Sequence, residues 1–294
     1  MVVISPSDFN QWRQWAEAQA IAADISLGEI NWFLQGLTSV TSLDLKLGIF
    51  KAIDSQKGLA ELSRLWEKRV ADKVPVQYLV GKTHWRNLEL IVTPDVLIPR
   101  PETEYLIDLA QEAATESDTN LTQGHWVDLG TGSGAIAIGL ATIFTKAKIH
   151  AVDQSTAALE IAQQNAKAYN LEKHIQLYAG SWWEPLQHLQ SKIQGMISNP
   201  PYIPAAMLPD LQPEVFQHEP HSALDGGDSG LEDIQILVTE SPKYLVSGGI
   251  WLIELMKGQG ESVAQLLKEN GQYSQIKVIN DLSGSDRYVM ARIK

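Results

Sequence analysis

Cysteine is absent from the 294 residues of this sequence. The chain therefore has no disulfide, no thiolate nucleophile and no cysteine-based zinc or iron–sulfur site. The seven histidines lack a metal-ligand spacing such as H-x-x-x-H, so we expect no metal site. These absences exclude several classes of redox and metal enzyme, and they favour the cytoplasm as the compartment.

Long apolar runs are also absent. The longest, near Ala135 to Phe144, is too short to cross a bilayer. The N-terminal segment has no basic region followed by an apolar stretch and a small-residue cleavage site. We therefore expect a full-length soluble protein.

Basic side chains are in short supply, and the shortage is confined to one part of the chain. The sequence has 23 Lys and Arg against 35 Asp and Glu, a formal net charge of −12. Residues 1–100 hold 11 of each sign, which leaves 12 basic and 24 acidic side chains for residues 101–294. A protein that binds by neutralising phosphates should show the opposite sign, so broad binding of free nucleic acid is disfavoured. A cationic cofactor or a basic protein partner suits this charge.

The length and a hydrophobic content of 44% favour two domains, each with its own core. Residues 1–74 are predicted to form a small helical bundle. Ser26 and Glu29 have the spacing of a capping box, and apolar residues follow them at helical period. Two extended runs, VQYLV and LELIV, flank a polar turn near Arg86 and Asn87. They predict a β-hairpin linker over residues 75–100.

From about residue 101 onward, apolar strands alternate with amphipathic helices, which is typical of a wound α/β sheet. Helices are expected over residues 135–143, 157–168 and 261–267. In such sheets ligands bind beyond the carboxyl ends of the strands, so functional residues are sought there. The expected strands are 126–129, 148–152, 175–178, 195–198, 250–253, 276–279 and 288–293.

A glycine-rich loop follows the first of these strands, ahead of a helix. It consists of Gly130, Thr131, Gly132, Ser133 and Gly134. Glycines let the backbone turn tightly and let a ligand approach without meeting a Cβ atom, while the start of the helix offers unpaired N–H groups. The loop therefore predicts a ligand site.

Asp153 ends the second strand, 19 residues after Gly134. A carboxylate there can accept hydrogen bonds from both hydroxyls of a ribose, which fits any adenosine-containing cofactor. The same residue also suits the N-terminus of the next helix, near Ser155. Gly130-x-Gly132-x-x-Ala135 with Asp153 matches a nicotinamide dinucleotide fingerprint as well, so hydride and methyl transfer both remain open at this point.

The end of the fourth strand carries Asn199, Pro200, Pro201 and Tyr202. Two consecutive prolines cannot donate ladder hydrogen bonds, so the strand should stop and leave the carbonyls of Asn199 and Pro200 free. The Asn199 side-chain oxygen and a free main-chain carbonyl are two acceptors for a planar NH₂ group, and Tyr202 adds an aromatic wall. Holding both N–H bonds stabilises positive charge on nitrogen and aims its lone pair at an electrophile, without a general base or metal.

Together these motifs resemble the amino-methylating S-adenosylmethionine-dependent methyltransferases, which include DNA adenine, RNA guanine and protein glutamine enzymes. The flanking segments 75–81, 96–104 and 219–231 resemble the PrmC/HemK family closely. That family consists of protein-(glutamine-N5) methyltransferases acting on the Gly-Gly-Gln glutamine of class 1 peptide chain release factors. The resemblance runs from roughly Arg69 to the C-terminus. It implies a Rossmann-like class I methyltransferase domain over residues 101–294, joined by the hairpin to the N-terminal bundle.

The resemblance also implies a cofactor site for S-adenosyl-L-methionine, with S-adenosyl-L-homocysteine as product. It places the methionine part against Gly130 to Gly134 and the ribose on Asp153, with Trp182 lining the base and Asn199 beside the cofactor. The family commonly has an acidic residue where this sequence has Ser181, a departure that affects recognition of the adenine amino group.

For the substrate, the resemblance implies that Asn199 holds the glutamine amide, with the Pro200 carbonyl as second acceptor. Pro201 completes the substrate-binding segment, and Tyr202 packs on the amide plane. Asn87 stands where the hairpin usually has glycine, and asparagine tolerates a positive φ. The bundle is expected to help dock the release factor, and the protein is expected to be a monomer.

Three other hypotheses compete with this one, and the lowest ranked is a non-catalytic binding module that retains the fold, because all the parts of the site are present. A nucleic-acid amino-methyltransferase, acting on adenine N6 or guanine N2, would use the same Asn-Pro-Pro-Tyr chemistry. The acidic second part and the lack of an evident target-recognition domain argue against it. A nicotinamide dehydrogenase would use the glycine loop together with Asp153.

Overall fold

The structure is a computed structural model that describes residues 1–117 and 119–294. The chain divides into two compact units. Unit 1 comprises Met1–Lys82 together with Gln212–His218, and unit 2 comprises Thr83–Leu211 together with Glu219–Lys294. The short segment Gln212–His218 therefore returns to the N-terminal unit from deep within the second half of the sequence, which the sequence pattern does not reveal.

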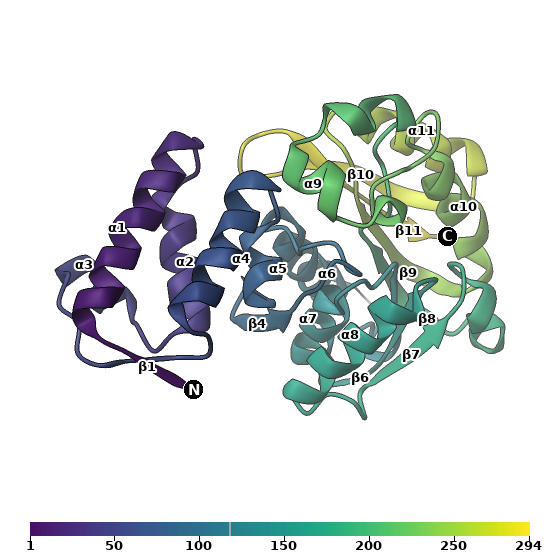
Figure 1. The fold of residues 1–294 in the computed structure, drawn as a ribbon. Helices are drawn as coiled ribbons and strands as arrows, with labels where there is room; N and C mark the ends of the chain where they lie inside the picture. The colour runs from purple at the N-terminus through teal and green to yellow at the C-terminus, as the bar shows by residue number, and fades with distance from the viewer. Residues whose placement is uncertain (118) are drawn as a thin grey trace. The chain divides into compact units, whose positions relative to one another are not determined.

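Unit 1 is mainly helical (Figure 1). Its core includes aromatic side chains that are fully buried, among them Phe9, Phe33 and Trp66. A two-stranded sheet of β1 (Val2–Ile4) and β2 (Ile53–Ser55) adds to the helices. The helices are α1 (Pro6–Ala22), α2 (Leu27–Leu37), α3 (Ser42–Leu47), α4 (Leu59–Ala71), α5 (Val76–Val80) and α9 (Pro213–His218).

The prediction of an extended VQYLV run is wrong, because Val76–Val80 is the helix α5. Pro75 precedes it at the N-cap, and Gly81 ends it in the left-handed conformation, with its N–H donating to the Gln77 carbonyl. The β-branched content favoured a strand. Contact with α2 reverses this preference, since a Cβ atom on Gly36 would lie 2.2 Å from Cγ1 of Val80.

The expected capping box at the start of α2 is also only half present. Ser26 is the N-cap, and its hydroxyl accepts a hydrogen bond from Gly28 N–H. Glu29 does not close the box, because its carboxylate instead binds Arg69 of α4, at 2.5 and 3.0 Å. A long-range ion pair has displaced the local interaction.

The hairpin is formed by β3 (Lys82–Trp85) and β4 (Leu88–Ile91). Its turn residue with positive φ is Arg86, at 53°, and not the expected Asn87. Arg86 N–H donates to Oε1 of Glu104 at 2.7 Å, and its guanidinium forms an ion pair with Asp108 at 2.8 Å. These contacts within unit 2 offset the cost of the left-handed backbone.

Unit 2 is built on a seven-stranded sheet with the order β10-β11-β9-β8-β5-β6-β7. The five strands β9, β8, β5, β6 and β7 run parallel to one another, whereas β11 runs antiparallel to both β9 and β10. All seven expected strands are present, and each is longer than predicted. They are β5 (Gln123–Leu129), β6 (Lys146–Asp153), β7 (Ile175–Ala179), β8 (Ile193–Ser198), β9 (Leu245–Glu254), β10 (Tyr273–Asn280) and β11 (Asp286–Ile293).

Helices cover both faces of this sheet, so unit 2 has two hydrophobic cores (Figure 1). Successive residues of β5 alternate between them: Trp126 belongs to one core and Val127 to the other. The first core includes α6 (Tyr105–Thr115), α7 (Ala135–Ile143) and α8 (Thr156–Ala168); the second includes α10 (Glu232–Glu240), α11 (Gly260–Asn270) and the 3₁₀ helix η2 (Glu184–Leu189). Across the described ranges, no helix is both long and apolar enough to traverse a bilayer.

Candidate active site

A cavity lies beyond the carboxyl ends of four parallel strands of unit 2. It is lined by residues 130–133 after β5, 153–155 after β6, 180–182 after β7, and Asn199 with Pro201 after β8. Strand β5 sits between β6 and β8, so this is the point where the strand order reverses. Open α/β sheets bind their ligands at such a switch point.

The glycine loop forms the floor of the cavity, with positive φ at Gly130, Gly132 and Gly134. A Cβ atom on Gly130 would lie 3.5 Å from the Trp182 ring, and one on Gly132 would meet nothing within 4 Å. Gly132 therefore keeps space open above the loop. Gly134 does not line the cavity; it lets α7 begin close to α8, since a Cβ atom there would lie 3.2 Å from Ala162.

Asp153 lies at the cavity wall and fixes the loop. Its Oδ2 accepts a hydrogen bond from Gly132 N–H at 2.8 Å, and its Oδ1 accepts one from Ser155 N–H at 2.9 Å. The N-cap of α8 is Ser155, whose hydroxyl accepts from Ala158 N–H. Burial raises the pKa of Asp153, although these N–H donors oppose the shift. Each carboxylate oxygen has a second lone pair, which remains available to a ligand hydroxyl.

Asp128, at the end of β5, is fully buried beneath the loop. Its Oδ2 accepts hydrogen bonds from the Thr131 hydroxyl at 2.6 Å and from Ala137 N–H at 3.0 Å. Its Oδ1 has no hydrogen-bond partner within the described chain. Burial raises the pKa of Asp128 to about 7. This carboxyl therefore supports the loop from below and does not face the cavity.

Trp182 lines the cavity beside the glycine loop, while the next residue, Trp183, is buried in the second core and stacks on Tyr244. Trp182 has a φ of 46°, and its indole N–H donates to Oδ1 of Asp233 at 3.1 Å. Ser181 also lines the cavity. Asp233 of α10 therefore places a carboxylate in the same cavity wall as Ser181, the position where the family commonly has an acidic residue.

The Asn-Pro-Pro-Tyr segment contributes unequally to the cavity. Asn199 and Pro201 line it, whereas Pro200 is buried and Tyr202 lies outside the lining. The Tyr202 hydroxyl donates to Oε1 of Glu254 at 3.2 Å. In the described part of the chain, neither the Asn199 nor the Pro200 carbonyl oxygen accepts a backbone hydrogen bond outside the regular elements. This agrees with strand β8 ending at Ser198.

The glycines of the segment 225–230 support Tyr202 through close packing. A Cβ atom on Gly226 would lie 2.8 Å from the Tyr202 Cα, and one on Gly230 would lie 2.4 Å from its carbonyl oxygen. Gln259 ties the two segments together, since its side-chain amide donates to the carbonyls of Tyr202 at 3.0 Å and Gly230 at 3.2 Å. Within the segment 219–231, which carries part of the family resemblance, glycine is therefore required at 226 and 230 by close contact with the backbone of Tyr202.

Sequence reasoning missed several residues around the cavity. Thr103 lines it and contacts Asn199, although it lies 96 positions earlier in the chain. Glu254 belongs to none of the sequence motifs; it is buried and accepts hydrogen bonds from Thr103 and Tyr202. Its position at the carboxyl end of β9 was the only signal that pointed to it. The cavity wall also includes Asp95, Val96, Leu97, Pro99, Pro220, Ser222, Ala223, Asp233 and Ile236.

The fold and the cavity define a class of enzyme. A family model of the methyltransferase small domain matches residues 106–218. The N-terminal domain of human METTL16, solved in complex with SAH, superposes with a TM-score of 0.52 at 14% identity, over 83% of this chain and 86% of that one. This likeness concerns the fold alone. Unit 2 therefore has the fold of the class I methyltransferases.

Relatives of similar length narrow the class to a family. Release factor glutamine methyltransferase from Synechocystis sp. is 49% identical over 98% of this chain and 97% of its own length. The protein of the same name from Thermosynechococcus vestitus is 46% identical over 98% of this chain and 99% of its own length. The chain belongs to the release factor glutamine methyltransferase family, and it is a protein-glutamine methyltransferase.

Proposed function

We propose that this enzyme transfers the methyl group of S-adenosyl-L-methionine to the side-chain nitrogen of the Gly-Gly-Gln glutamine in class 1 peptide chain release factors. The observation that carries the proposal is the Asn199 side chain. It lines the cavity, its Nδ2 is engaged by Thr103, and its Oδ1 has no hydrogen-bond partner in residues 1–117 and 119–294. An uncommitted acceptor at the end of β8 suits a primary amide.

The cavity residues fit the proposed cofactor. Residues 130–133 leave room above the backbone because Gly132 has no side chain there. Asp153 has acceptor capacity for ribose hydroxyls, and the Trp182 ring offers an apolar surface to a base. When bound, S-adenosyl-L-methionine supplies an electrophilic methyl group on a positively charged sulfur. The relatives' name and the SAH complex of the METTL16 domain are consistent with this donor.

In the proposed reaction the protein holds and orients the substrate amide. An amide nitrogen is a weak nucleophile because its lone pair is delocalised over the carbonyl. Asn199 Oδ1 and the Pro200 carbonyl would accept hydrogen bonds from its two N–H groups, stabilise the positive charge that develops on nitrogen, and direct its lone pair at the methyl group. As the N–CH₃ bond formed, the S–CH₃ bond would break with its electron pair left on sulfur, and the nitrogen would lose one proton to solvent. Tyr202 would support this segment, and Pro201 would form part of the wall.

The substrate is proposed to be a release factor because the chain covers nearly the whole length of relatives that carry that name. The helical bundle of residues 1–74 would help dock it, and residues 75–100, which contain α5 and the β3–β4 hairpin, would join the bundle to the catalytic part. We expect the enzyme to act as a monomer in the cytoplasm.

The test is transfer of labelled methyl from S-adenosyl-L-methionine to a purified release factor. We expect label on the factor, and none after its Gly-Gly-Gln glutamine is replaced by alanine. Asn199→Ala should lower turnover by on the order of 100-fold or more, since it removes a preorganised polar group. Asp153→Ala is the matched comparison and should mainly weaken binding of S-adenosyl-L-homocysteine in calorimetry. Label that persists on the altered factor, or equal loss of cofactor affinity in both variants, would contradict the proposal.

A further inference from the structure

A chain of hydrogen bonds leads from Asn199 into the protein interior. Asn199 Nδ2 donates to the Thr103 hydroxyl oxygen at 3.2 Å, and the Thr103 hydroxyl donates to Oε2 of Glu254 at 2.7 Å. The Tyr202 hydroxyl donates to the other carboxylate oxygen, Oε1, at 3.2 Å. Thr103 is 4% exposed and Glu254 is 1% exposed, so water does not compete for these bonds.

The direction of this chain fixes which end of the Asn199 amide faces Thr103. Both carboxylate oxygens of Glu254 act as acceptors, Oε2 for the Thr103 hydroxyl and Oε1 for the Tyr202 hydroxyl, so the single proton of the Thr103 hydroxyl is committed to Glu254. The Thr103 oxygen can then serve Asn199 only as an acceptor. The Asn199 NH₂ group must point to Thr103, and its Oδ1 is left as the acceptor for a ligand.

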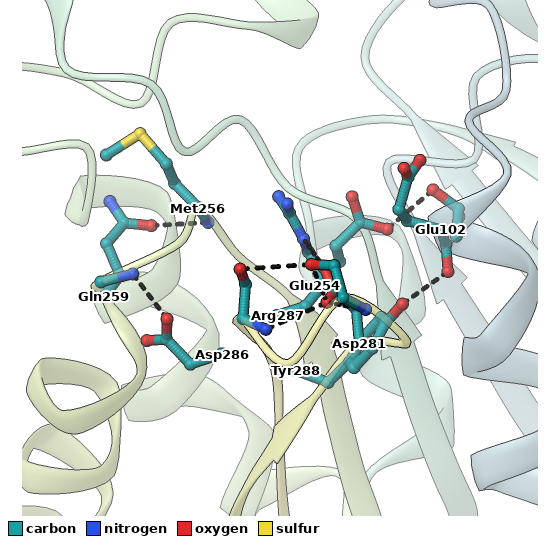
Figure 2. Close-up of polar contacts among 12 residues, drawn as sticks. Glu102, Glu254, Met256, Gln259, Asp281, Asp286, Arg287 and Tyr288 are labelled. Carbon is teal, nitrogen blue, oxygen red and sulfur yellow. Dashed lines mark hydrogen bonds and ion pairs between the residues drawn. The ribbon is translucent and has the colours of Figure 1, made fainter.

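Thr103 is itself held from two sides. It lies in the short 3₁₀ helix η1 (Glu102–Glu104). The Tyr288 hydroxyl donates to the Glu102 carbonyl at 2.7 Å (Figure 2), and the Trp85 indole N–H donates to the Arg100 carbonyl at 3.0 Å. Figure 2 also shows Glu254 beside Arg287 and Tyr288, and Tyr288 is its direct partner in the pairing of β9 with β11. The Thr103 hydroxyl is therefore held in place by hydrogen bonds to the carbonyls of Glu102 and Arg100, and its partner Glu254 is held by the pairing of β9 with β11.

We infer that Thr103 and Glu254 are positioning residues, which hold the Asn199 amide in the orientation that presents Oδ1 to the substrate glutamine. This inference rests on the proposed function, because it assigns Asn199 the role of substrate acceptor. Without the hydroxyl of Thr103, the Asn199 amide can rotate or flip, so that its NH₂ group and not Oδ1 faces the substrate. Tyr202 acts through the same carboxylate and fixes its second oxygen.

The experiment compares Thr103→Val, which keeps the shape but removes the hydroxyl, with Thr103→Ser, which keeps the hydroxyl. We expect Thr103→Val to lower kcat about 10- to 100-fold while S-adenosyl-L-homocysteine affinity in calorimetry stays within about threefold. Thr103→Ser should restore kcat to within about threefold of the unaltered enzyme. If the role of Thr103 were purely structural, Thr103→Val would have a lower melting temperature than the unaltered enzyme. Thr103→Ser would then restore kcat only where it also restored the melting temperature, and this result would overturn the inference.

A double-mutant cycle with Asn199→Ala separates this inference from the proposed function. If Thr103 acts through Asn199, adding Thr103→Val to Asn199→Ala changes kcat by less than about twofold. Multiplicative losses in the double variant would show that Thr103 contacts substrate or cofactor directly, and would overturn the inference while leaving the proposed function standing. Unchanged turnover in Asn199→Ala alone would instead overturn the proposed function.

Discussion

At the scale of single residues, Asp128 and Asp153 show how burial and local donors set the state of a carboxyl group beneath a ligand loop. Both lie at the ends of neighbouring parallel strands, and both accept hydrogen bonds from the loop or the helix after it. They differ in that Asp153 reaches the cavity, whereas Asp128 is sealed below it with one oxygen unpaired. An unpaired carboxylate oxygen in the interior is costly, which favours its protonated form.

The pKa of Asp128 leads to a prediction about stability. Its pKa is raised by burial to about 7 in the folded protein, against 3.8 in a solvated chain. Below about pH 4 the group is neutral in both states. As the pH rises from about 4 to 7, the unfolded chain loses this proton first, so the free energy of unfolding falls. At about 1.4 kcal/mol per pKa unit, this loss is on the order of 4 kcal/mol.

Asp128→Asn removes the titrating group, so the variant should not lose this part of its free energy of unfolding as the pH rises from 4 to 7. The stability of the variant relative to the unaltered protein should therefore increase over this range. Denaturant unfolding at several pH values measures it. Asp8→Asn, at an exposed position, serves as the control substitution. A pH-independent difference for Asp128→Asn would contradict the assignment.

At the scale of elements, unit 1 contains a three-way ion pair that ties α9 to the helices of the bundle. Arg69 of α4 is 5% exposed; its guanidinium contacts Glu29 of α2 and, at 3.0 Å, Glu214 of α9. The His218 imidazole adds a hydrogen bond with the Asp72 carbonyl. α9 lies in the segment that leads from Tyr202 to Glu219, so part of the connection that follows the Asn-Pro-Pro-Tyr motif belongs to unit 1.

Arg69→Met should therefore destabilise unit 1 by on the order of 2–3 kcal/mol, because it leaves two carboxylates without their shared cation. Thermal unfolding measures the loss, and limited proteolysis should show faster cleavage within residues 212–218. Arg64→Met breaks an exposed pair with Glu61 on the same helix and is the matched control, with little effect expected. Equal melting temperatures for the two variants would argue against a structural role for the buried arginine.

At the scale of the whole molecule, the net charge of the enzyme favours a protein substrate over a nucleic-acid substrate. The chain carries a formal net charge of −12, and all of the excess lies in residues 101–294, which supply most of the cavity lining. Such a surface repels a polyphosphate backbone and accepts a cationic donor or a basic protein. Charge thereby favours a release factor over the competing nucleic-acid substrate.

We expect that single-stranded RNA or DNA containing adenine and guanine takes up no methyl label from this enzyme under conditions where a release factor is labelled. A tenfold excess of such an oligonucleotide should also leave labelling of the factor unchanged at physiological salt. Scintillation counting of the separated products measures both. Methylated adenine or guanine in the oligonucleotide would revive the nucleic-acid alternative.

The sequence determined the secondary structure of the sheet and the chemical character of the site. Period-two and helical patterns located all seven strands of unit 2, and the glycine loop, Asp153 and Asn199 follow strands whose carboxyl ends share one edge. These features are local, because strand ends, glycine turns and proline stops depend on neighbours in the chain. Residues 76–80 show the limit of such local prediction: they are predicted to be extended but form the helix α5, since contact with Gly36 overrode the local preference.

Only the tertiary structure decided which distant groups serve the site. The contacts of Asn199 with Thr103, of Thr103 with Glu254, and of Arg69 with Glu214 join residues 96, 151 and 145 positions apart. No periodicity encodes such pairs, because they depend on how sheet and helices pack. For the same reason the sequence could not show that Tyr202 faces Glu254, or that the positive φ of the hairpin falls on Arg86. The sequence alone shows which residue types follow each strand. Their contacts, and therefore their roles, depend on how the folded chain brings distant residues together.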